Sequence, residues 1–166
     1  VMNSKTKANG FDLGAGFDLP TESMWEIAAR AGTLTKFAWG DSSSGYSDYC
    51  WTQGESTKPV SVGQKKPNAW GLFDVSGNVW DMTRDTGNRA VDLKTLSAQV
   101  ADATQPNVSG GGSDVSSYTV RRGGGSCAQN PMSGENIQFY WLSSKAGVVK
   151  SSPMSDNSSF RIAYYH

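Results

Sequence analysis

Residues 71–82 read Gly71-Leu72-Phe73-Asp74-Val75-Ser76-Gly77-Asn78-Val79-Trp80-Asp81-Met82 and hold the strongest structural signal in this chain. A Ser-Gly-Asn turn lies between apolar residues, because glycine and asparagine tolerate the backbone angles of a tight bend. The carboxylates of Asp74 and Asp81 flank this turn. Such a bend, with main-chain carbonyls between two carboxylates, suits a hard cation such as calcium. The alternative is that Asp74 caps the turn and Asp81 lies on a solvated strand face.

The composition limits what the chain can be. Its 166 residues are the length of one domain, and 15 basic residues balance 15 acidic ones. No basic surface for a nucleic acid is therefore expected. No apolar run is long enough to span a membrane. Six tryptophans, six tyrosines and six phenylalanines offer large areas for burial, which favours a loop-rich α+β domain held by aromatic anchors.

One helix is predicted with clear boundaries. It begins after Pro20, with Thr21 as the N-cap residue and acidic side chains in its early turns. Trp25 belongs to its buried stripe, and Gly32 stands where a C-cap glycine is expected.

Beyond the helix, the pattern predicts short elements separated by irregular backbone. Strands are expected at residues 118–122, 137–142 and 160–165, and a short amphipathic helix is expected at residues 91–103. Trp80 and Phe160 are expected to be core residues whose replacement unfolds the domain.

Four blocks, at residues 19–30, 71–82, 120–126 and 160–163, resemble in order and spacing the formylglycine-generating-enzyme (sulfatase-modifying-factor) domain family. The resemblance runs from Phe17 to the C-terminus. It implies a C-type-lectin-like α+β fold with little regular secondary structure. Residues 1–166 are expected to form one such domain, with an upstream N-terminal portion missing.

The resemblance also implies a metal site. In the family, the residues that match Asp74 and Asp81 supply carboxylate oxygens to calcium, and those that match Gly77 and Val79 supply backbone carbonyls. The ion would be structural, and no other cofactor is expected. Arg161 is expected to be a structural arginine paired with a carboxylate or a carbonyl.

The enzymatic members of the family use a close pair of cysteines after the block that matches residues 122–126. Here Cys127 follows Ser126 directly, and the two positions of the pair hold Ala128 and Ser133. Cys50 is far away in the sequence, and the two cysteines are expected to be unpaired or to form one disulfide. A copper(I) ion needs both thiolates close together, so the sequence predicts that this chain is not an enzyme.

Residues 127–159 depart most from the enzyme pattern and are rich in serine, glycine, asparagine, tyrosine, tryptophan and methionine. This composition is typical of adaptable binding surfaces, although ordinary loops share it. The candidate ligand-binding residues are Cys127, Gln129, Asn130, Tyr140, Trp141, Ser143, Met154 and Asp156.

The position of this segment resembles that of the variable region in target proteins of diversity-generating retroelements, such as treponeme variable surface proteins. The departures are Cys127 in place of tryptophan and Ser159 in place of glycine. The leading hypothesis is a non-enzymatic, receptor- or adhesin-like protein, expected to be monomeric, at the bacterial cell surface or in the periplasm. A lipoprotein anchor would precede residue 1, and the ligand would be a protein or a glycan. The alternatives are a formylglycine-generating oxidase and a structural accessory domain of a lipoprotein.

Overall fold

The computed structural model describes residues 16–52, 54–87, 108–109, 118–125, 146–150 and 158–165. In chain order the elements are β1 (Gly16–Asp18), α2 (Glu22–Arg30), the 3-10 helix η1 (Ser43–Gly45), α3 (Tyr46–Tyr49), β2 (Trp80–Gly87), β3 (Val108–Ser109), β4 (Tyr118–Arg122), β5 (Ala146–Lys150), β6 (Ser158–Phe160) and β7 (Ala163–Tyr165). None of the helices in these ranges is long and apolar enough to cross a membrane.

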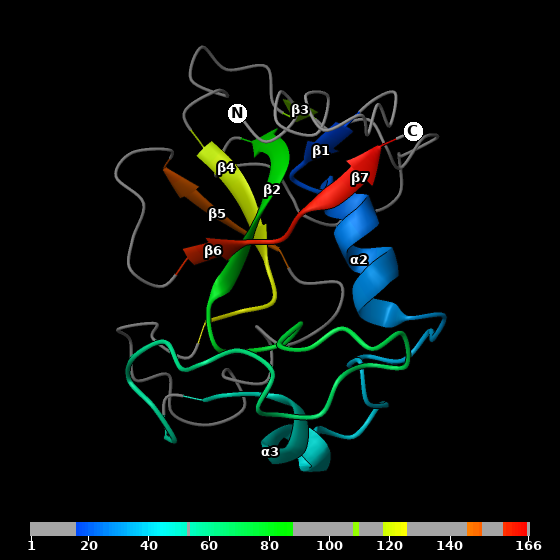
Figure 1. The fold of residues 1–166 in the computed structure, drawn as a ribbon, viewed down its shortest axis with the longest axis vertical. Coiled ribbons are helices and arrows are strands. Elements are labelled where there is room, and N and C mark those ends of the chain that lie inside the picture. The colour runs from blue at the N-terminus through cyan, green and yellow to red at the C-terminus, as the bar shows by residue number, and fades with distance from the viewer. Residues whose placement is uncertain are drawn as a thin grey trace, which may run out of the picture.

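Strand β2 is the centre of the larger sheet (Figure 1). It pairs antiparallel with β4 and parallel with both β6 and β3, while β5 pairs antiparallel with β4. A second, two-stranded sheet joins β1 to β7, so the two ends of the described chain lie side by side. Helix α2 packs beside these strands, whereas α3 lies at the opposite end of the molecule.

Helix α2 begins as the sequence predicts. Thr21 has an extended backbone, and its Oγ1 accepts a hydrogen bond of 3.2 Å from the main-chain N of Met24. The helix ends one residue earlier than expected, because Ala31 rather than Gly32 is the left-handed cap, with φ of 48°. Gly32 follows with φ of 86°, so the chain leaves the helix through two consecutive residues with positive φ.

Among the described residues, the buried core contains three aromatic anchors, Trp25, Phe37 and Trp80. Trp25 and Ala29 of α2 pack against Val75 of the 71–82 turn. Trp80 is 3% exposed, as expected for a core residue. A second cluster contains Phe37 and Cys50.

The expectation for Phe160 is wrong. Its side chain is 61% exposed. The predicted strand at residues 160–165 is instead two strands, β6 and β7, separated by Arg161 and Ile162. Arg161 points toward the core, and alternation along the chain therefore leaves the Phe160 ring outside. The predicted strand at 118–122 is confirmed as β4, whereas the predicted segments at 91–103 and 137–142 lie wholly outside the described residues.

Candidate functional site

The 71–82 turn is tied to the neighbouring segment by two polar side chains. Asn78 accepts a hydrogen bond from the main-chain N of Val60 and donates one to its carbonyl oxygen, each at 3.1 Å. Asp74 accepts a hydrogen bond from the main-chain N of Gly63 through its Oδ2, at 2.7 Å. Both Asp74 and Asn78 have positive φ, which aspartate and asparagine tolerate better than other side chains. The turn is therefore held by its own polar residues.

Gly77, at the centre of the turn, lies directly against other backbone segments. Its N donates to the carbonyl oxygen of Gly123 at 2.8 Å, and it forms a single parallel bridge with Trp51. A Cβ at this position would lie 2.5 Å from the carbonyl oxygen of Trp51. The turn therefore packs between Trp51 and Gly123, the residue that follows β4.

Asp81 and Arg161 form the polar centre beside the turn. Asp81 is buried, and its Oδ2 accepts hydrogen bonds from Nε1 of Trp25 at 2.9 Å and from Nε of Arg161 at 2.5 Å. Nη2 of Arg161 donates to the main-chain oxygen of Asp74 at 2.7 Å. Burial raises the pKa of the Asp81 carboxyl above its ordinary value, and the Arg161 guanidinium opposes that shift. Arg161 is thus the paired structural arginine that the sequence predicts.

The four residues predicted to bind calcium lie in one region, because Asp74, Gly77 and Val79 belong to the turn and Asp81 follows it in β2. The solvated-face alternative for Asp81 is wrong, since this side chain is buried. Its Oδ2 already has two side-chain donors, one of them cationic. In the ranges that the structure describes, no group of three or more His, Cys, Asp or Glu side chains is arranged to hold a metal ion. Calcium binding stays a prediction.

A second ionic cluster lies beneath α2, and the sequence did not reveal it. Arg122 is fully buried, and its two terminal nitrogens donate to Glu22 at 2.5 Å and to Glu26 at 2.6 Å. The main-chain N of Glu22 donates to Oδ2 of Asp85 at 2.6 Å. Burial raises the pKa of Glu22, against the opposing influence of Arg122. One feature of the sequence could have indicated this cluster. Glu22 and Glu26 have i,i+4 spacing, which places both carboxylates on one helix face.

The thiol of Cys50 is not available for chemistry. Cys50 is fully buried beside Phe37, and burial raises the pKa of its thiol well above the ordinary value. A thiol in such surroundings is inert, because the thiolate is the reactive form. Cys127 lies outside the described residues, as do the other candidate ligand-binding residues, Gln129, Asn130, Tyr140, Trp141, Ser143, Met154 and Asp156.

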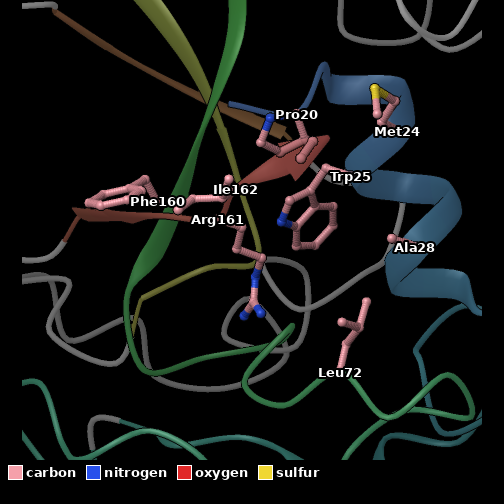
Figure 2. A pocket seen from close by; sticks show the side chains of 9 residues that line it. Pro20, Met24, Trp25, Ala28, Leu72, Phe160, Arg161 and Ile162 are labelled. Carbon is pink, nitrogen blue, oxygen red and sulfur yellow. The ribbon is translucent and has the colours of Figure 1, made fainter. Parts of the chain in front are cut away.

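Two depressions meet at Arg161, Phe160 and Leu72. The first, which we name the helix-side depression, has a volume of about 570 Å³ and lies between α2 and residues 160–163. Figure 2 shows Trp25 and Arg161 facing one another in it, with Met24 and Ala28 along the helix. The second, which we name the turn-side depression, has a volume of about 400 Å³. Its lining includes Val62, Phe73, Asp74, Asp81, Phe160 and Arg161.

Several known proteins are similar to this chain in sequence or in structure. The model of a family described as sulfatase-modifying factor enzyme 1-like domain matches residues 2–164. The formylglycine-generating enzyme of Mycobacterium tuberculosis is 40% identical over 83 residues, which are 42% of this chain and 27% of that enzyme. Treponema denticola variable protein 1 has a similar structure, with a TM-score of 0.66 and 26% identity over 89% of this chain and 47% of that chain.

The structure of PvdO from Pseudomonas aeruginosa is also similar, with a TM-score of 0.67 and 18% identity over 97% of this chain and 57% of that chain. At that identity the likeness concerns the fold alone. These similarities confirm the predicted α+β, C-type-lectin-like fold with little regular secondary structure. Since the family model covers nearly the whole sequence, the chain belongs to the sulfatase-modifying factor enzyme 1-like domain family.

Proposed function

We propose that this domain is a non-enzymatic ligand-binding module, and that residues 127–159 form its binding face. The observation that carries the proposal is the way in which this segment is attached. Residue Asp81 of β2 pairs on one side with Arg122, at the end of β4, and on the other side with Ser159 of β6. The chain therefore leaves Asp81 at Arg122 and returns to it at Ser159, and in between it contributes β5, which pairs with β4.

Both attachment points are fixed by charged side chains. Arg122 is held by Glu22 and Glu26 at the start of the segment, and Arg161 is held by Asp81 just after its end. Binding residues are commonly carried on loops that a rigid scaffold positions. The similarity to a protein named as a variable protein supports the same interpretation. The proposal includes diversification of the segment by a retroelement, a bacterial surface or periplasmic location, and a monomeric state.

The expected result is that aromatic residues of the segment contribute to binding. Wild-type protein is tested on arrays of immobilised glycans and extracellular proteins, beside Tyr140→Ala and Trp141→Ala. The two positions alternate in any regular strand, so one of the two variants should bind about 5- to 30-fold more weakly without losing its thermal unfolding transition. Leu34→Ala is the matched control, because Leu34 is 97% exposed and lies outside the segment. Equal binding by all variants would contradict the proposal.

The alternative, a formylglycine-generating oxidase, is favoured by the 40% identity to the Mycobacterium tuberculosis enzyme. Against it stand the absence of the cysteine pair after Ser126 in the sequence and the burial of Cys50. We expect a sulfatase-type cysteine peptide to keep its mass when it is incubated with the protein, copper and oxygen. Time-dependent loss of the peptide thiol that Cys127→Ser abolishes would establish the oxidase instead.

The third interpretation, an accessory structural domain of a lipoprotein, differs in what it predicts for the gene. It predicts that residues 127–159 vary among isolates no more than residues 118–125 do, whereas a diversified binding face predicts variation concentrated in 127–159.

A further inference from the structure

We propose that the helix-side depression binds an apolar side chain of a partner polypeptide, such as leucine, together with the uncharged peptide carbonyl beside that side chain. This inference goes beyond the proposed function, because the described residues that line the depression lie outside the 127–159 segment. It therefore stands or falls independently of that face.

The first argument is the apolar lining. Met24 and Ala28 of α2 lie on one side of the depression and Ile162 on the other, while Leu72 comes from the 71–82 turn (Figure 2). Ile162 is 48% exposed and Phe160 is 61% exposed, so large apolar side chains face solvent here. Concave apolar surface with few polar groups is typical of binding sites. A volume of about 570 Å³ accommodates a leucine side chain and its peptide group.

The second argument is a free hydrogen-bond donor. Arg161 is the one charged residue among the described residues that line the depression. Its Nε donates to Asp81 and its Nη2 to the main-chain oxygen of Asp74. In the described part of the chain, its third nitrogen, Nη1, has no hydrogen-bond partner. The side chain is 29% exposed, and Nη1 is not among the buried polar atoms that lack a partner. Arg161 thus keeps one donor that solvent can reach.

The orientation of the guanidinium group assigns this donor to the helix side. The group is planar, and the edge that carries Nε and Nη2 faces Asp81 and Asp74. Both aspartates line the turn-side depression and neither lines the helix-side depression, whereas Arg161 lines both. Nη1 lies at the opposite edge of the group. It is therefore available to a ligand that lies against α2.

The third argument is charge. Arg161 already forms an ion pair of 2.5 Å with Asp81 and also binds the main chain of Asp74. A carboxylate at Nη1 would compete with these acidic residues, and an ammonium group would meet a cation. An uncharged carbonyl accepts the hydrogen bond without adding a charge. Most hydroxyl groups of a glycan would have no partner in this lining, which makes their burial costly. A peptide carbonyl beside an apolar side chain fits both parts of the depression.

The test is a titration of the isotope-labelled chain with N-acetyl-L-leucinamide, followed by NMR. The reporter is the indole N–H of Trp25, which lines the depression. The internal control is the indole N–H of Trp39, which donates to the main-chain oxygen of Ser42 outside the depression. We expect a saturable shift of the Trp25 signal alone. N-acetylglycinamide, which lacks the apolar side chain, should bind at least about tenfold more weakly. N-acetyl-L-leucine, which carries a carboxylate, should bind at least about threefold more weakly.

Two variants complete the experiment. Ile162→Ala should weaken binding about fivefold, and Ile27→Ala is the matched control, because Ile27 is also about half exposed but does not line the depression. Ala28→Leu should abolish the saturable shift by filling the depression, since leucine is accommodated well in a helix. If Ala28→Leu does not fold, Ile162→Ala gives the answer.

Four outcomes would overturn the proposal. They are equal or tighter binding of N-acetyl-L-leucine, unchanged binding in Ile162→Ala, a Trp25 shift at lower concentrations of N-acetylglucosamine than of N-acetyl-L-leucinamide, and a Trp25 shift on dilution of the free protein. The third outcome would identify a sugar site, and the fourth would show that a second copy of the chain covers the depression.

Discussion

Arg122→Ala is expected to lower the free energy of unfolding by about 3–5 kcal/mol, the cost of leaving buried charges without their partner. Arg122 is fully buried and bridges the carboxylates of Glu22 and Glu26. Its removal leaves Glu22 buried beside Glu26 and Asp85, two further acidic groups that raise its pKa. Since small domains are stable by only about 5–15 kcal/mol, this loss removes a large fraction of the total stability and should lower the urea midpoint clearly. Urea denaturation followed by tryptophan fluorescence measures the loss.

The matched control is Arg30→Ala, because Arg30 binds the other oxygen of Glu26 from the same helix. This pair is partly exposed and has i,i+4 spacing, so its loss should cost about 1 kcal/mol or less. A triple variant that combines Arg122→Met with Glu22→Gln and Glu26→Gln should recover much of the lost stability, because the two carboxylates that Arg122 neutralises are then uncharged. If Arg122→Ala and Arg30→Ala have equal denaturation midpoints, the cluster does not stabilise the fold.

The sequence predicts those features that depend on neighbours along the chain. The N-cap at Thr21 and the buried position of Trp25 follow from local patterns, and both are confirmed. The 71–82 turn is also predicted, because its positive φ angles fall at Gly71, Asp74, Gly77 and Asn78, residue types that tolerate them.

Features that depend on distant residues could not be predicted in the same way. Arg122 meets Glu22 across 100 residues, and Arg161 meets Asp81 across 80. The exposure of Phe160 depends on how β6 pairs with β2. The sequence of one short strand does not show which of its two faces turns toward the core. The contacts of Asp74 could not be predicted either. Gly63 donates a hydrogen bond to its Oδ2, and its Oδ1 has no hydrogen-bond partner among the described residues. The candidate ligand-binding residues of 127–159 all lie outside the described residues and stay predictions.

Gly77→Ala is expected to be the most damaging single-methyl change in the 71–82 turn. Gly77 has φ of 79°, and a Cβ there would lie 2.5 Å from the carbonyl oxygen of Trp51 and 2.9 Å from its nitrogen. Both contacts are with backbone, so the turn and the segment at residue 51 would have to separate. A left-handed alanine costs about 1–2 kcal/mol, and overpacking adds about 1–3 kcal/mol. The expected loss in the free energy of unfolding is therefore about 2–5 kcal/mol.

Gly63→Ala separates these two costs. Gly63 has φ of 77°, nearly the same as that of Gly77, but a Cβ there would meet nothing within 4 Å. Its amide hydrogen bond to Asp74 does not need the missing side chain and is kept. Gly63→Ala should therefore show the conformational cost alone, about 1–2 kcal/mol. The difference between the two variants in urea denaturation measures the close approach of Gly77 to Trp51, and a difference of zero would mean that this glycine is required by its φ angle alone.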